Sequence, residues 1–180
     1  MKQTPSDPLD TALSGPQAAA QLAAQMAAGG APLVTGTADK PFANMLCFSV
    51  YAAQLAFNRL YKQLLAPHGL TYLQYLVLVA LAQAEDRTVG ELGDVLFLES
   101  NTLTPLLKRM EAAALVVRRR DAEDERVVRV ALAPAGAEVV AQVECVPLDV
   151  LSALDMPLGD LQQMKAAIDR LGSELRKSTT

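Results

Sequence analysis

The stretch Leu98–Leu115 reads LESNTLTPLLKRMEAAAL, and the rest of the chain is interpreted from it. Its apolar residues recur every three or four positions, which places them on one face of a helix. Its hydroxyl, amide and basic side chains fall mainly on the other faces, where they can contact base edges and phosphates. Taken alone, this pattern is more typical of an amphipathic core helix with a solvated face. The polar residues concerned are Ser100, Asn101, Thr102, Thr104, Lys108 and Arg109.

The segments on either side of this stretch indicate a winged helix-turn-helix. Thr71 is expected to cap the helix TYLQYLVLVALAQA, and Thr88 to start the short helix VGELGDVLFL after an EDR loop. Residues 115–120 and 126–132 predict two strands around the acidic turn DAEDE. Two short helices, a third with a polar face and then a hairpin give an order that is far more specific than any single element.

The start of the third helix has two solutions. A start at Ser100, which we favour, puts Pro105 inside the helix and removes one hydrogen bond. A later start would use Thr104 as cap and Pro105 as the first helical residue. Basic residues continue beyond the helix, so that the segment from Ser100 to Arg120 holds five Lys or Arg residues and one acid. The arginines after the helix are Arg118, Arg119 and Arg120.

The outer segments predict dimerisation helices. A helix is expected from Pro41, in its first turn, to near Ala66, and it is apolar around much of its circumference. A further helix is expected from Pro134, kinked at Pro147, and a last one after Pro157. These apolar faces exceed the needs of a winged helix, so residues 41–67 and 134–177 are predicted to build an intertwined homodimer around the DNA-binding residues 70–133. Residues 1–40 are predicted to be a flexible extension.

Composition sets limits on function. The chain has 180 residues, 51% of them hydrophobic, which is ample for one domain with a core. Aromatic residues make up 4% and Trp is absent, which argues against stacking on single strands or RNA. The net charge of −4 lowers the expectation of a nucleic-acid partner, but a local basic patch governs docking. No apolar run is long enough to span a bilayer and no signal-peptide pattern is seen, so we expect a cytoplasmic protein with no membrane partner.

Enzymatic, cofactor and metal chemistry find little support. The one histidine, His68, lies in a Pro-His-Gly turn, and there is no P-loop, GxGxxG or paired His motif. We therefore expect no enzyme, no cofactor and no metal. The acidic run 121–125 suggests a cation site or a solvated wing turn, and the turn is favoured because no calcium-loop spacing is present.

Several segments together resemble the MarR family of bacterial dimeric repressors, and more narrowly its organic-hydroperoxide-resistance regulators. They are LCFSVYAA, GLTYLQYLVL, ES and TLTPLLKRMEAA on either side of Asn101, and RRRDAEDERVVRVAL. The resemblance covers about Phe42 to Glu138, and the C-terminal helices match in pattern only. It implies a MarR-type winged helix domain over residues 41–180, mostly α with a small β-hairpin wing, that binds double-stranded DNA.

The resemblance also assigns roles in DNA binding. It implies that the helix starting at Ser100 enters the major groove and that Arg126 reaches the adjacent minor groove. Asp124 would position that wing arginine. One departure is Ala114, where these proteins commonly have Gly at the helix end. A residue with a Cβ fits there only with a negative φ or with strain.

Cys47 is the candidate sensing residue, although a lone helical cysteine is usually a small buried hydrophobe. Tyr51, four residues on, shares its helix face. Tyr61 also shares that face, but on a straight helix it lies roughly 21 Å away at 1.5 Å per residue. In an antiparallel two-fold dimer, Tyr61 of one subunit would approach Cys47 of the other.

The resemblance implies that Cys47 is hydrogen-bonded across the dimer by Tyr61 and Tyr72, with Tyr51 at a further tyrosine position. Ordinary core packing is the alternative for these tyrosines. Phenol donors stabilise a thiolate, which attacks a peroxide to give a sulfenic acid. Family members with a C-terminal cysteine trap that sulfenate as an intersubunit disulfide, and Cys145 lies in the comparable helix. A buried bystander is the alternative for Cys145.

The sequence therefore predicts a redox-sensing repressor that binds palindromic DNA as a homodimer and is released when organic hydroperoxides oxidise Cys47. The apolar residues around the thiol are expected to favour organic over hydrogen peroxide. One alternative is a repressor released by a small phenolic or lipophilic ligand, with Cys47 merely packing. Another is a helical dimer that acts as a protein-interaction module.

Overall fold

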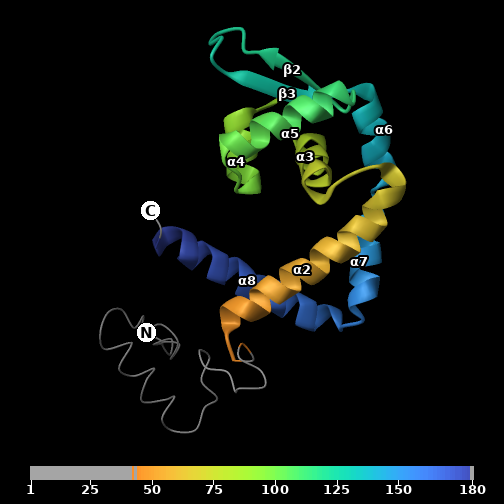
Figure 1. Cartoon of the computed structure of the whole chain (residues 1–180), viewed down its shortest axis with the longest axis vertical. Helices are drawn as coiled ribbons and strands as arrows, with labels where there is room; N and C mark the ends of the chain where they lie inside the picture. The colour runs from red at the N-terminus through yellow and green to blue at the C-terminus, as the bar shows by residue number, and fades with distance from the viewer. Residues whose placement is uncertain (1–41, 43, 179–180) are drawn as a thin grey trace, which may run out of the picture. The chain divides into compact units, whose positions relative to one another are not determined.

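The computed structural model describes residues 42 and 44–178, so the predicted extension 1–40 and Pro41 lie outside the described residues. The chain divides into two units, Met1–Ala56 and Phe57–Thr180, and the boundary falls within the first described helix. Along the chain the elements (Figure 1) are α2 Leu46–Leu65, η1 Ala66–His68, α3 Tyr72–Gln83, β1 Arg87–Thr88, α4 Val89–Leu96, α5 Ser100–Ala112, β2 Val116–Arg120, β3 Val128–Leu132, α6 Pro134–Gln142, α7 Val146–Leu154 and α8 Leu158–Ser178.

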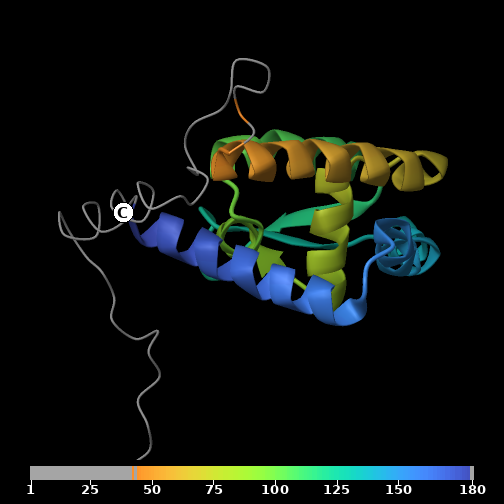
Figure 2. The same cartoon turned by 90° about the horizontal axis from the view of Figure 1, so that it is seen from below.

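The second unit contains a winged helix-turn-helix. Helix α3 packs against α4, α6 and β3, while α5 packs against α4 and β2. Figure 2 shows α3 lying across the strands of the sheet. The core between these elements consists of large side chains with almost no solvent exposure, among them Leu78, Leu81, Leu92, Leu103, Leu107, Met110, Val116 and Val130. The predicted fold class, mostly helical with a small wing, is confirmed.

The wing is part of a three-stranded antiparallel sheet with the order β1-β3-β2. In the hairpin, Val116 pairs with Leu132 and Arg120 with Val128. The predicted strands are confirmed, with ends trimmed by one or two residues. Strand β1 was not predicted: Arg87 was assigned to a loop and Thr88 to the start of the next helix, because two residues carry no alternation by which a strand can be recognised. It forms because β3 offers a free edge, where Arg87 pairs with Val130.

Local capping fixes the starts of two helices. The side chain of Thr71 accepts a hydrogen bond from the Gln74 N–H while the Gln74 side chain accepts from the Thr71 N–H. Thr88 and Glu91 form the same reciprocal pair at the start of α4. Such a capping box satisfies two of the unpaired donors at a helix start. The predicted starts after Thr71 and Thr88 are therefore confirmed.

Helix α5 begins at Ser100 with Pro105 inside, as favoured from the sequence. Its cap residue is Glu99, whose side chain makes no capping hydrogen bond. Pro105 has no N–H, so the carbonyl of Asn101 loses its usual helical partner. Both features leave polar main-chain groups uncommitted near the start of α5.

Two predictions about the outer helices need correction. The first helix begins at Leu46 rather than at Pro41. The segment after Pro134 is two helices rather than one kinked helix, since α6 ends at Gln142 and α7 begins at Val146. Pro147 is the second residue of α7, where its missing N–H costs nothing, whereas continuing α6 through it would clash with the carbonyl four residues back. Helix α8 follows Pro157 as predicted.

Much of the apolar surface of the outer helices is uncovered in the single chain. Leu65 is the one buried residue of α2, and α8 has none among its described residues. No single described helix is long and apolar enough to cross a membrane; α2 with η1 and α3 reach that length and hydropathy only together, as a pair bent by 72°.

Candidate DNA-binding surface and sensing thiol

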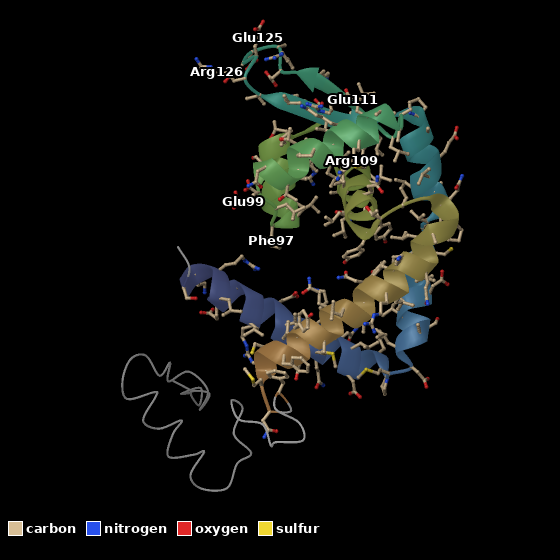
Figure 3. The ribbon with its side chains drawn as sticks, in the orientation of Figure 1. Phe97, Glu99, Arg109, Glu111, Glu125 and Arg126 are labelled. Carbon is tan, nitrogen blue, oxygen red and sulfur yellow. The ribbon has the colours of Figure 1, made fainter. Side chains whose placement is uncertain are left out.

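Helix α5 presents the polar face that the sequence predicts. Leu103, Leu106, Leu107 and Met110 are buried against the core. Thr104 is partly buried, and the other predicted contact residues are exposed: Ser100, Asn101, Thr102, Lys108 and Arg109. Figure 3 shows Glu99 at the start of this helix and Arg109 further along it. The arrangement leaves hydroxyl, amide and basic groups available to a nucleic acid.

A groove connects this helix to the wing. It has a volume of about 470 Å³ and is lined by residues of α4, α5 and the hairpin, including Ser100, Thr104, Arg118 and Arg126. Arg126 itself is exposed, and Figure 3 shows it beside Glu125 at the tip of the hairpin. The start of α5 and the wing therefore border one continuous surface, as a protein that reads adjacent grooves of a duplex requires.

Asp124 organises the wing turn through the main chain. Its carboxylate accepts a hydrogen bond from the Arg126 N–H at 2.9 Å, and its carbonyl accepts one from the Val127 N–H at 2.9 Å. The role predicted for Asp124 was to position the wing arginine. The observed contact is with the backbone of Arg126, which sets where its side chain leaves the turn.

The three arginines of β2 make contacts within the protein. Arg118 pairs with Glu111 at 3.2 Å, and Arg119 pairs with the carboxylate of Asp86. Arg120 donates to the carbonyl of Glu125 at 2.6 Å. Their predicted role on DNA stays a prediction, but the three guanidinium groups already contact α5, the loop before β1 and the wing turn, respectively.

Sequence reasoning missed Arg129, which lies on β3 between valines. Its guanidinium pairs with Asp121 and with Asp86, residues that come from the wing turn and from the loop before β1. The one signal in the sequence is a charged residue within an apolar strand, eight residues after an aspartate. That signal does not reveal Asp86, which is brought near by the fold.

The end of α5 answers the question that Ala114 raised. The φ of Ala114 is +56°, in the left-handed region, so Ala114 carries backbone strain rather than a negative φ. The Leu115 N–H donates to the Met110 carbonyl and the Ala114 N–H to the Glu111 carbonyl, both at 2.9 Å. These bonds close the helix as a glycine-ended helix is closed.

Three tyrosines meet where α2 ends and α3 begins. The ring centroids of Tyr61 and Tyr72 are 4.3 Å apart, and Tyr75 lies 5.8 Å from Tyr61 and 6.4 Å from Tyr72. Desolvation, with smaller contributions from Tyr72 and Tyr75, raises the pKa of Tyr61 to about 12. Burial likewise raises the pKa of Tyr72. Both phenols therefore keep their protons near neutral pH and can donate hydrogen bonds.

Tyr75 was not among the predicted site residues. It is 6% exposed and lies three residues after Tyr72, on the same face of α3. The spacing was visible in the sequence, but a tyrosine at that spacing is usually core. The structure places it against both predicted tyrosines.

Both thiols are free and exposed. Cys47 is the second residue of α2, and near it the ring of Phe48 lies 4.9 Å from that of Phe42 and 6.1 Å from that of Tyr51. Cys145 occupies the cap position of α7. In the single chain neither cysteine is the buried bystander that the sequence left as an alternative.

Comparisons with known proteins agree with this architecture. A family model of the transcriptional regulators SarA/Rot matches residues 59–143. The chain is 47% identical over 130 residues to the HTH-type transcriptional regulator TtmR of Methylorubrum extorquens, across 72% of this chain and 65% of that protein, just under two thirds of its length. It is 41% identical over 125 residues to the organic hydroperoxide resistance transcriptional regulator of Bacillus subtilis, across 69% of this chain and 85% of that protein.

Among solved structures, reduced AbfR bound to DNA is similar, and AbfR is a protein of Staphylococcus epidermidis. The TM-score is 0.67 at 35% sequence identity, and the match covers 77% of this chain and 94% of that chain. The match extends beyond the winged helix alone, since the two chains are superposed over most of their lengths.

Proposed function

The chain belongs to the MarR family of transcriptional regulators, in the group of the organic hydroperoxide resistance regulators, and we propose that it is a repressor controlled by oxidation. As a member of this family it is a DNA-binding regulator. In the proposal, it is released from DNA when an organic hydroperoxide oxidises Cys47. Its relatives are transcriptional regulators rather than enzymes, which sets aside catalysis and a pure protein-interaction module.

On DNA, we propose that α5 enters the major groove and Arg126 the adjacent minor groove. The exposed polar side chains at the start of α5 would contact base edges, and Lys108 and Arg109 would contact phosphates. A two-fold dimer places two such helices about 34 Å apart, one turn of the duplex, which matches a palindromic site.

The exposed apolar side chains support a homodimer as the DNA-binding form. In one chain most of them lie outside the winged helix, chiefly on α2, α7 and α8, and a soluble monomer rarely leaves such patches uncovered. The residues that a second copy would cover are Leu46, Phe48, Val50, Tyr51, Leu55, Leu148, Leu151, Leu158, Met164 and Ile168.

The observation that carries the sensing role is the packing of Tyr61 against Tyr72 at 4.3 Å. The pair holds two protonated phenols side by side, and the pKa of Tyr61 is about 12. Helix α2 runs unbroken through both Cys47 and Tyr61, so fourteen residues separate them by about 21 Å along its axis. We therefore propose that the phenols serve the Cys47 thiolate of the other subunit.

The chemistry follows from a thiolate beside hydrogen-bond donors. The Cys47 sulfur takes the terminal oxygen of the hydroperoxide, the O–O bond breaks, and the alkoxide that leaves takes a proton to become an alcohol. The product sulfenic acid carries no charge, so the phenols lose the charge-assisted hydrogen bonds that the thiolate accepted. A shift of α2 against α3 would then change the spacing of the two α5 helices on DNA.

Binding of the full-length protein to palindromic DNA from its own upstream region tests this proposal. Cumene hydroperoxide should release wild type, while Cys47→Ser should bind equally well and stay bound. The same series with hydrogen peroxide should show slower release, given the apolar residues near Cys47. A repressor released by a phenolic or lipophilic ligand predicts instead that Cys47→Ser and wild type respond alike.

A further inference from the structure

We propose that Arg129 is a positioning residue that locks the wing turn to the corner before β1, so that Arg126 is presented to DNA in one place. The inference rests on the proposed function for its readout on DNA, but the lock itself is a property of the fold. Neither Arg129 nor its partners Asp121 and Asp86 were expected to act in DNA binding.

The first step is the bridge that Arg129 makes between two distant segments. Its Nε donates to the Asp121 carboxylate in the wing turn. Its Nη1 donates to the main-chain carbonyl of Asp86 at 3.1 Å and lies 3.7 Å from the Asp86 carboxylate. Asp86 belongs to the loop between α3 and β1, 43 residues away in the chain. One guanidinium therefore holds the wing against the start of the helix-turn-helix.

The second step leads from Asp121 to Arg126. The other carboxylate oxygen of Asp121 accepts from the N–H of Glu123 at 2.8 Å and of Asp124 at 3.3 Å. Asp124 in turn accepts from the Arg126 N–H at 2.9 Å. The backbone of the turn is thus hydrogen-bonded to the same carboxylate that Arg129 binds. Consistent with this, the pKa of Asp121 is lowered to about 2. The hydrogen bond from Arg129 makes the largest contribution, and the hydrogen bonds from the N–H groups of the turn come next.

The third step concerns Asp86, the anchor at the other end. Its φ is +61°, in the left-handed region, which is uncommon for a residue with a Cβ although Asp adopts it more readily than most. Its Oδ1 is buried and makes no hydrogen bond, so the carboxylate is held through Oδ2, which pairs with Arg119 and Arg129. The corner at Asp86 and the wing therefore support each other through Arg129.

The geometry requires an arginine rather than any cation. The two aspartates approach different nitrogens of one planar group, which a lysine ammonium cannot reproduce. The Arg129 side chain is 33% exposed, and the nitrogens named above are engaged within the protein. Its contribution to DNA binding is thus expected to pass through Arg126.

A double-mutant cycle on DNA affinity tests this. Arg126→Gln should weaken binding about tenfold, the usual size for one groove contact. Arg129→Gln should weaken it as much, and adding Arg126→Gln to it should change affinity less than about twofold, because the wing arginine is already misplaced. Arg129→Lys should not restore affinity. Lys165→Gln removes the same charge from α8 and should leave affinity unchanged. If the affinity losses of Arg126→Gln and Arg129→Gln multiply in the double variant, or if Arg129→Lys restores affinity, Arg129 contacts DNA directly and the proposal is overturned.

Amide hydrogen exchange separates failure of this inference from failure of the proposed function. If Arg126→Gln has no effect on affinity, the role of Arg126 on DNA is wrong, yet the lock still predicts that Arg129→Gln loses protection at Glu123 and Asp124. Unchanged protection there would overturn the lock. Should Arg129→Gln not fold, Asp121→Asn keeps every cation and must give the same loss of affinity and protection.

Discussion

Ala114 shows how one residue adjusts the end of α5. With φ at +56°, it carries a penalty that a glycine would not. An L-residue in this region costs about 1–2 kcal/mol, and glycine gives back about 0.5–1 kcal/mol in backbone entropy. Ala114→Gly should therefore raise the free energy of unfolding by about 0.5–1 kcal/mol in urea denaturation.

The neighbouring Ala113 provides the control, because its φ is −85°. Ala113→Gly gains nothing from the freedom of glycine and should be neutral or destabilising. Equal stability changes at the two positions would contradict the assignment of strain to Ala114.

Asp121 gives a prediction about pH. Its pKa is lowered from 3.8 to about 2 by Arg129 and by the N–H groups of the turn. A carboxyl with a lowered folded-state pKa stabilises the fold above its unfolded pKa, and that contribution fades as pH falls from about 4 to 2. Asp121→Asn should therefore be less stable than wild type at neutral pH, and the difference should shrink as pH falls towards 2. A difference that does not vary with pH would contradict this.

At the scale of elements, caps decide where the helices begin. Thr88 and Glu91 form a reciprocal cap, while Glu99 before α5 makes no side-chain cap. Thr88→Ala should lower the free energy of unfolding by about 1 kcal/mol, whereas Glu99→Ala should change it little. Thermal and urea unfolding of the two variants would show this, and equal losses would mean that the caps do not fix these helices.

The same contrast explains which elements could be predicted from the sequence. Starts after Thr71 and Thr88 follow from side chains a few residues away, so the sequence contains the whole cause. Strand β1 and the separation of α6 from α7 depend on what packs beside them. No pattern within two residues marks a strand, and a proline near a helix start differs from a kinking proline only in context.

The candidate site divides in the same way. The polar face of α5 was predictable because helical periodicity alone sorts Leu103 and Leu107 from Lys108 and Arg109. Tyr75 was missed because its spacing from Tyr72 is equally typical of a core residue. Arg129 was missed because its partner Asp86 comes from another element. For the same reason, a run such as Arg118–Arg120 does not reveal which charges are used inside the protein.

At the scale of the whole molecule, the second cysteine makes a prediction about the oxidised dimer. Cys145 is exposed at the cap of α7, where its thiol can condense with a Cys47 sulfenic acid from the other subunit, releasing water and forming a disulfide. After organic hydroperoxide, wild type should run as a crosslinked dimer on a non-reducing gel and Cys145→Ser should not. Wild type that stays monomeric would show that Cys145 does not resolve the sulfenate.

The central claim is that the phenols reach the thiol from the partner subunit, since α2 is too stiff to bring them together within one chain. Mixed dimers in a Cys145→Ser background test it. In the first mixed dimer, the chain that carries the single Cys47 has Tyr61 and Tyr72 changed to Phe, and the partner chain keeps both tyrosines. In the other, Cys47 shares its chain with both tyrosines and the partner has neither.

The measurement is the rate at which cumene hydroperoxide converts that single Cys47 to sulfenic acid, followed by mass spectrometry after trapping. The account predicts wild-type reactivity in the first mixed dimer and slow oxidation in the second. Fast oxidation when thiol and tyrosines share a chain, with slow oxidation when they lie on different chains, would contradict it.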